Sequence, residues 1–226
     1  VDPGPFTERL AVRRGLMREA RSSATASSGA ENPRGSILVV AGSATPVTKK
    51  QLQHLIANDE RVCHIPVDAE LLVDRKNAAE IEVNRVVQQA REGVPAQQNA
   101  MFVFESAWTG RLLNLQEEEQ RFGLAHGRAA ENINQGLGNI VREVLSCAAG
   151  EIKGLYMTGG DTMVNVLKEL GATGIEMIDY VIPQTDMVRI IGGDYAGLIC
   201  VGKGGLTGPV DLISTIVERI YKEAQI

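Results

Sequence analysis

Short apolar runs alternate with amphipathic stretches along most of the chain. The runs are rich in Val, Ile and Leu and are only five to seven residues long, which is typical of buried strands. Between them, apolar residues recur at helical spacing, and one such stretch opens on Pro46, a residue that favours the first turn of a helix. Strands are predicted at residues 36–41, 61–67, 100–106 and 152–158, and helices at 46–59, 77–92 and from about Arg121 to Ala149.

The pattern changes in the last third of the chain. A helix at 161–170 is followed by three strand-like runs that only short turns separate, which indicates an antiparallel meander. The runs cover 174–182, 186–193 and 195–202, and a helix beginning near Pro209 closes the chain. Repeated alternation of strand and helix predicts an α/β fold. We expect a mostly parallel sheet flanked by helices, with antiparallel strands near the C-terminus.

The N-terminal part lacks this alternation. A charged helix is predicted to start near Thr7, and a Ser-, Ala- and Gly-rich stretch without apolar periodicity follows it. We therefore expect an N-terminal helix and flexible linker over residues 1–35, and one globular domain over 36–226.

Composition narrows the function classes. A net charge of −5 and a pI near 5.3 argue against a nucleic-acid surface, which would be basic. No apolar run approaches the roughly 20 residues that span a bilayer, so no membrane partner and a cytoplasmic location are expected. The cysteines and histidines are scattered without metal-ligand spacing, which predicts buried, reduced thiols and no structural metal site.

Three loops that follow predicted strands are small and polar. They are 41–48, 158–162 and 202–208. Each combines a strand end, a Gly/Ser/Thr-rich turn and a helix start, so each offers unpaired backbone N–H groups and the positive end of a helix without side chains that would hold a phosphate away. Because carboxyl ends of parallel strands share one sheet edge, the three loops together predict a site for an anion such as a nucleotide triphosphate.

Plain turn chemistry is the alternative for each loop. Ser43 or Thr45 is then the N-cap of the helix at 46–59, Asp161 or Thr162 caps the helix at 161–170, and the Gly204–Gly205 pair permits positive φ. Neither the Walker A loop, GxxxxGK[ST], nor a GxGxxG motif is present.

Charged residues near these loops also allow two interpretations. Lys203 either pairs with a phosphate as a point charge or is solvated at a strand end. Glu105, Asp161 and Asp211 can each hold Mg²⁺, directly or through water. Otherwise Glu105 is a solvated strand end, and the two aspartates lie in first helical turns, where the helix dipole favours an acid.

Three motifs resemble a known family. The stretches VAGSATPVTKKQ, TGGDTMVNVLKELG and KGGLTGPVDLI are similar, in order and spacing, to motifs in the nucleotide-binding domain of the four-carbon acid sugar kinases. The resemblance covers roughly residues 36 to 222. It implies a kinase that phosphorylates threonate, erythronate or 3-oxo-tetronate with ATP, assisted by Mg²⁺.

The resemblance also implies which residues contact ATP. Lys203 matches the lysine of the third motif, although this chain has Gly204 where the family prefers Ser or Pro and Thr207 where it has Phe. The nucleotide-binding residues implied are Ser43, Gly159, Gly160, Asp161, Thr162, Lys203 and Gly205.

Family members carry a second, N-terminal domain that binds the sugar acid, and only about 35 residues precede the first strand here. The resemblance therefore implies that this chain binds nucleotide but needs the substrate domain for turnover, and that the general base lies there, so no catalytic residue is assigned. Two alternatives stay open: a kinase or phosphatase acting on another phosphorylated metabolite, and a non-catalytic regulatory or effector module. The apolar stripe of the long helix can pack on the sheet or on a second copy, which leaves a homodimer open.

Overall fold

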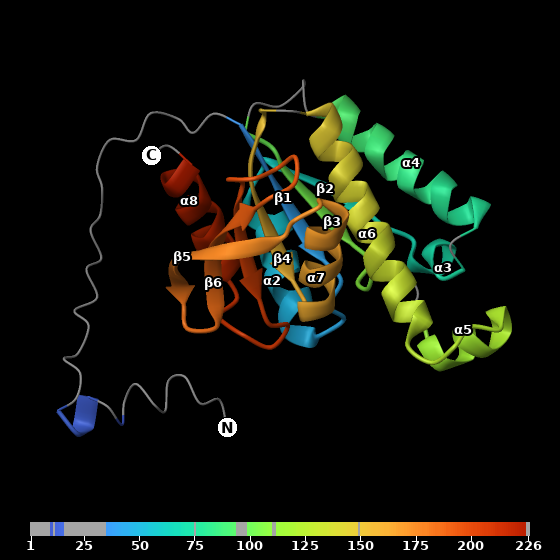
Figure 1. The fold of residues 1–226 in the computed structure, drawn as a ribbon, viewed down its shortest axis with the longest axis horizontal. Helices are drawn as coiled ribbons and strands as arrows, with labels where there is room; N and C mark the ends of the chain where they lie inside the picture. The colour runs from blue at the N-terminus through green and yellow to red at the C-terminus, as the bar shows by residue number, and fades with distance from the viewer. Residues whose placement is uncertain are drawn as a thin grey trace.

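The computed structural model describes Leu10, residues 12–15, and then residues 35–74, 76–93, 99–109, 112–148 and 150–224. Most of the expected N-terminal helix and its linker lie outside these residues. The described part from Gly35 onward forms one sheet with helices on both faces, as Figure 1 shows.

The sheet has seven strands in the order β2-β3-β1-β4-β7-β6-β5. The first five in this order run parallel, whereas β6 is antiparallel to both β7 and β5. The expected α/β fold and its antiparallel C-terminal meander are therefore confirmed. The strands are β1 (Ser36–Ala41), β2 (Val62–Pro66), β3 (Met101–Glu105), β4 (Ile152–Thr158), β5 (Gly174–Ile182), β6 (Thr185–Ile191) and β7 (Ile199–Lys203).

Two helices cover one face of the sheet and the others lie on the opposite face (Figure 1). On the first face, α2 and α8 pack on strand residues such as Ile37 and Val39; on the second, α4, α6 and α7 pack on Leu38 and Val40. The helices are α2 (Pro46–Asn58), α3 (Ala69–Leu72), α4 (Asn77–Gly93), α5 (Leu115–Phe122), α6 (Arg128–Cys147), α7 (Gly160–Glu169) and α8 (Leu212–Ala224).

The single helix expected from Arg121 to Ala149 is wrong. The chain forms α5 and α6 with a break between them, because Gly123 ends α5 with a left-handed φ of 64° and Gly127 precedes α6 with a φ of 84°. Glycine adopts this conformation without steric cost, which lets the chain turn between the two helices. The apolar stripe of α6 is buried against the sheet, so that stripe does not need a second copy to cover it.

Two smaller expectations also change. The last strand covers Ile199–Lys203 rather than 195–202, because Asp194–Gly197 form a turn that returns the chain from β6. Cys200 is buried as expected, but Cys63 is only partly buried and Cys147 is exposed. Among helices of the described residues, none combines the length and the apolar character that crossing a bilayer demands.

Candidate functional site

Four neighbouring parallel strands end in register at one edge of the sheet. Their last residues are aligned in the order Glu105, Ala41, Thr158 and Lys203. The three glycine-rich loops follow three of these residues directly, so they leave the sheet side by side. The strand order therefore brings the three loops together at one edge of the sheet, as the sequence predicts.

The first and third loops touch each other. A Cβ placed on Gly205 would collide with Ser43 Oγ and would lie 3.0 Å from Thr45 Cγ2. The hydroxyls of Thr45 and Thr48 both donate to the carbonyl oxygen of Gly205, the second at 3.1 Å. Only a glycine allows this approach, and the contact holds the two loops in a fixed relation.

The second loop contacts both of its neighbours. The Gly159 amide donates to Lys203 O at 3.1 Å, and a Cβ on Gly159 would lie 3.8 Å from that of Ser43. Gly159 has a φ of 107°, which favours glycine, whereas a Cβ on Gly160 would meet nothing within 4 Å. Gly160 is exposed, so the backbone that begins α7 borders open space.

The helix caps agree only in part with the alternative that these loops are ordinary turns with capping side chains. Thr45 is the N-cap of α2, with its side chain accepting from the Thr48 amide. Neither Asp161 nor Thr162 caps α7: the N-cap is Gly159, and no side chain bonds to the first turn. The amides at the start of α7 are therefore free of a capping side chain, which leaves them able to bind an external acceptor. Positive φ in the third loop occurs at Gly208 rather than at Gly204 or Gly205.

The Thr162 hydroxyl bonds to a neighbouring helix instead of capping α7. The Thr162 side chain is buried and donates to Asn134 Oδ1 of α6 at 2.7 Å. Asn134 in turn donates to Ala130 O, and a Cβ on Gly42 would lie 2.9 Å from Asn134 Oδ1. Asn134 was missed from the sequence, because nothing near it marks its partner 28 residues later.

Lys203 is neither solvated nor extended toward open space. It is only 4% exposed, and its ammonium donates to Gly204 O at 2.9 Å and to Thr207 O at 3.2 Å. Burial lowers the pKa of Lys203 to about 8. The side chain lies beneath the third loop and holds two of its carbonyl groups.

Gln51 of α2 is a second residue that the sequence did not single out. It is buried, and its Nε2 donates to Thr207 O at 3.0 Å, Gly208 O at 3.2 Å and Pro209 O at 2.8 Å. A signal existed: Thr48 and Gln51 occupy the same inward stripe of α2 as Leu52 and Leu55. Polar residues on a stripe that faces the core need buried partners.

Glu105 is buried, so the interpretation of this residue as a solvated strand end is wrong. It is 1% exposed and accepts hydrogen bonds from His64 Nε2 at 3.3 Å, from the Trp108 amide at 2.6 Å and from the Thr109 hydroxyl. Burial by itself would raise the pKa of Glu105, but the bonds from His64, Thr109 and the two amides outweigh it, so the pKa is lowered. With its oxygens engaged in this way, Glu105 organises the loop after β3.

A small apolar pocket adjoins the first loop. Its volume is about 120 Å³, and it lies between the loops after β1 and β3 and the helices α5 and α6. Leu112, which lines the pocket, is 71% exposed. The residues that line it include Gly42, Ala44, Ser106, Leu112, Leu113 and Ile133.

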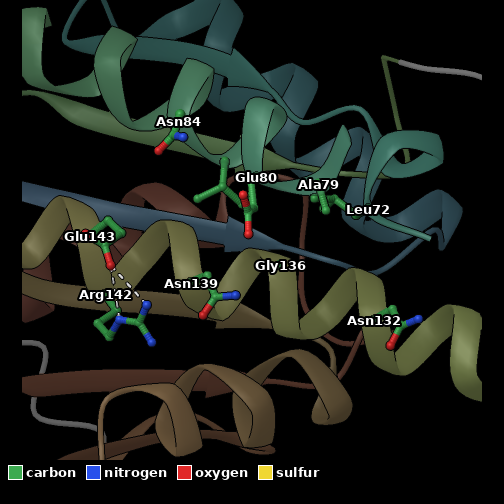
Figure 2. Close-up of a pocket in the computed structure, with 10 residues that line it drawn as sticks. Leu72, Ala79, Glu80, Asn84, Asn132, Gly136, Asn139, Arg142 and Glu143 are labelled. Atoms are coloured by element: carbon green, nitrogen blue, oxygen red, sulfur yellow. Dashed lines mark hydrogen bonds and ion pairs between the residues drawn. The ribbon is translucent and has the colours of Figure 1, made fainter. Parts of the chain in front are cut away.

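A cavity of about 360 Å³ lies between α4 and α6, away from the three loops (Figure 2). Figure 2 shows the Glu80 carboxylate pointing from α4 toward α6, while Arg142 turns away from α4. Arg142 is engaged by Glu143 and by Glu169 of α7. None of the loop glycines lines this cavity, which therefore lacks the free backbone amides of the sheet edge.

The carboxylates near the three loops do not form a cluster. Asp161 is exposed in the first turn of α7, and Asp211 is exposed just before α8. Within the ranges that the structure describes, no three His, Cys, Asp or Glu side chains gather to hold a metal ion. A divalent ion at this edge would need most of its ligands from a bound phosphate and from water, which is the usual arrangement for Mg²⁺.

Known proteins with similar sequences are sugar-acid kinases. The chain is 34% identical over 222 residues to the D-erythronate kinase of Heliobacterium modesticaldum, a match covering 97% of this chain and 47% of that protein. It is 25% identical over 185 residues to the D-threonate kinase of Salmonella typhimurium, covering 82% of this chain and 42% of that one. The chain thus spans about half the length of these relatives, or less.

A solved structure and a family model agree with these relatives. A Bordetella bronchiseptica protein, described as a domain of unknown function with bound citrate in a domain-swapped dimer, superimposes with a TM-score of 0.64 at 26% identity, covering 83% of this chain and 41% of that one. The model described as the nucleotide-binding C-terminal domain matches residues 38–213. The resemblance seen in the three loop motifs is thereby confirmed, and the chain belongs to this family, the C-terminal nucleotide-binding domain of the four-carbon acid sugar kinases.

Proposed function

We propose that this chain is the ATP-binding part of a kinase that phosphorylates a four-carbon sugar acid of the erythronate, threonate or 3-oxo-tetronate type. The observation that supports this most is the contact among the three glycine-rich loops at the ends of β1, β4 and β7. Phosphoryl transfer relies mainly on positioning and on stabilising phosphate charge, which backbone amides and a helix N-terminus can supply.

The triphosphate would lie against Ser43, the Gly159–Thr162 segment and Gly205. In this arrangement the exposed Gly160 leaves room for phosphate oxygens next to the first turn of α7. Thr162 contributes indirectly, since its hydroxyl is bound to Asn134 and fixes the loop. Mg²⁺ would be held chiefly by the phosphates, with Asp161 as the single carboxylate that the loop offers.

The apolar pocket beside Gly42 would take the adenine base. The pocket is lined mostly by Ala, Leu and Ile side chains, with Ser106 and Asn134 as polar groups at its wall, and such a lining suits a flat heterocycle. Because the pocket adjoins the first loop, a base placed there lies next to a phosphate chain that crosses toward α7.

We place the sugar-acid site and the general base in the half of the kinase relatives that this chain does not match. The chain spans 47% of the D-erythronate kinase and 42% of the D-threonate kinase that it matches. We therefore expect nucleotide binding without turnover from this chain alone, in the cytoplasm, where ATP is available. Assembly of two full-length copies is expected by analogy with the domain-swapped Bordetella neighbour.

Calorimetric titration of the chain with ATP and ADP, with and without Mg²⁺, tests the proposal. Dissociation constants on the order of micromolar to millimolar are expected, the range common for enzyme substrates. An absence of adenine-nucleotide binding under all these conditions would overturn the proposal.

Gly160→Leu separates a binding loop from a purely structural turn. A Cβ at Gly160 meets nothing within 4 Å, so the fold should be retained while nucleotide affinity falls by tenfold or more (~1.4 kcal/mol) through steric exclusion. Gly159→Ala is the contrasting variant: its φ of 107° and the 3.0 Å approach to Thr162 Oγ1 predict lost stability. Unfolding curves and titrations of both variants give the comparison. A Gly160→Leu protein that binds ATP like the wild type would contradict the placement of phosphate at α7.

A further inference from the structure

The third loop has an ordered pattern of inward carbonyl groups. The carbonyl oxygen of Gly204 is bound by Lys203 Nζ, that of Gly205 by the hydroxyls of Thr45 and Thr48, and that of Thr207 by both Lys203 Nζ and Gln51 Nε2. These side chains come from the end of β7, from the N-cap of α2 and from the first half of α2, and Gly204 O also accepts from the Thr207 amide within the loop at 3.3 Å. Side chains from outside the loop therefore bind three of its carbonyl oxygens, those of Gly204, Gly205 and Thr207.

Peptide geometry then fixes where the loop amides point. In a trans peptide unit the carbonyl of one residue and the N–H of the next point in opposite directions. Holding the oxygens of Gly204, Gly205 and Thr207 against the protein body turns the N–H groups of Gly205, Leu206 and Gly208 to the other side. Within the described residues, none of these three N–H groups has a protein acceptor. Gly208 also has a φ of 87°, a conformation that lets successive amides converge.

Lys203 is poorly placed for the direct phosphate contact that its sequence position suggested. Its side chain is 4% exposed and its ammonium already donates to two carbonyl oxygens. Gln51 is equally buried and donates to three consecutive carbonyl groups of residues 207–209. Both side chains act on the loop from below, so neither needs to reach a ligand to affect its binding.

We propose that Lys203 and Gln51 are positioning residues for the nucleotide phosphates: they hold the carbonyl oxygens of the 204–208 loop inward and so present the amides of Gly205, Leu206 and Gly208 to the phosphate. This inference rests on the proposed nucleotide site and assigns to it two residues that act through the loop backbone. A loop with few side chains depends on such supports, because its glycines otherwise populate many conformations.

The test uses Lys203→Met and Gln51→Met, with two exposed residues as matched controls. Gln53→Met places the same change on the outer face of α2, and Lys222→Met removes a lysine charge from the last turn of α8. The first measurement is made without nucleotide, as NMR order parameters of the Gly205, Leu206 and Gly208 amides. They should fall from about 0.85 to below about 0.6 in both loop variants and stay unchanged in both controls.

The second measurement is the affinity for ATP with Mg²⁺ by calorimetry. Each loop variant should bind about tenfold more weakly or worse, and the double variant should be no weaker than the weaker single variant, because each change disorders the same loop. Unchanged order parameters in both loop variants would overturn the positioning role. So would a loss of affinity confined to Lys203→Met, which is the signature of a direct charge–phosphate contact.

Different results would contradict the proposed function and the positioning role of Lys203 and Gln51. If the wild-type chain binds no adenine nucleotide, the proposed function is wrong, and the order parameters still decide whether the two side chains order the loop. If Lys203→Met does not fold, Gln51→Met carries the decision alone, since it removes a donor from Thr207 O, the carbonyl group that both side chains bind.

Discussion

At the scale of residues, the site depends on buried polar side chains that bond to loop backbone. Lys203, Gln51 and Thr48 are all nearly inaccessible and all donate to the loop after β7. Glu105 does the converse after β3, where its carboxylate accepts from the amides of the following turn. Tight loops leave backbone groups without regular partners, and burying those groups unpaired would cost stability, so side chains supply the missing bonds.

Glu105 should therefore contribute to stability in a pH-dependent manner. Glu105→Gln removes the charge while keeping the shape, and we expect it to lower the free energy of unfolding at pH 7 by about 1–3 kcal/mol. The pKa of Glu105 is lowered in the folded state, so its stabilisation is present above its ordinary value of 4.5 and is lost as the pH falls through the lowered value. His64, the other titratable group of this contact, is retained in both proteins.

Urea unfolding of wild type and Glu105→Gln between pH 7 and pH 3 measures this effect. The difference between the two proteins should narrow toward acid pH. Glu60→Gln, at an exposed position, serves as the control and should match the wild type throughout. A constant difference across the whole range would mean that the charge of Glu105 is not the source of its effect.

At the scale of elements, α6 connects the site to the rest of the molecule. It packs on the sheet, and it approaches α3 and α7 closely at two glycines: a Cβ on Gly136 would lie 2.8 Å from Leu72 of α3, and one on Gly138 would lie 2.7 Å from Glu169 of α7. The same helix carries Asn134, which binds Thr162 of the second loop. A displacement of α6 should therefore reach the nucleotide loops.

Gly136→Leu tests the close approach of α6 to α3. The Cβ of the added side chain would lie 2.8 Å from Leu72 Cδ1 and would displace it, so we expect the free energy of unfolding to fall by about 1–3 kcal/mol through overpacking. Chemical denaturation checks the prediction, and Ser146→Leu on the exposed side of α6 should change stability by less than about 0.5 kcal/mol. If Gly136→Leu were as stable as the wild type, α3 and α6 would not be in the close contact described.

At the scale of the whole molecule, one sheet carries all three of the glycine-containing loops, while the chain covers less than half of its kinase relatives. Each loop connects a strand of the sheet to a helix that packs on the sheet, so both ends of the loop are fixed. A ligand that bridges the three loops should consequently stabilise the fold as a unit rather than one segment of it.

Nucleotide should accordingly raise the stability of the entire chain. At a free ATP concentration of 100 times the dissociation constant, the free energy of unfolding should rise by about 2.7 kcal/mol, because only the folded state binds. Thermal unfolding with increasing ATP measures this, and erythronate or threonate alone should leave the transition unchanged. A sugar acid that shifts the transition without nucleotide would place the acceptor site in this chain.

The sequence by itself determined most strands and helices, because apolar spacing at periods of two and about 3.6 is a local property. It also marked the three loops, since glycine-rich turns between a strand and a helix are visible without knowledge of the fold. It did not reveal the break before α6, where the helical pattern continues across Gly123 and Gly127. The amphipathic pattern in this region is compatible with one long helix or with two shorter helices.

Only the tertiary structure decided how the loops are held. Gln51 and Thr207 are 156 residues apart, Thr48 and Gly205 are 157 apart, and His64 meets Glu105 across neighbouring strands. Local pattern carries no information on such pairs, because which strands are neighbours depends on how the whole sheet is assembled. The strand order β3-β1-β4-β7 brings the loops together, and it places the Lys203 ammonium within hydrogen-bond distance of two carbonyl oxygens of the third loop.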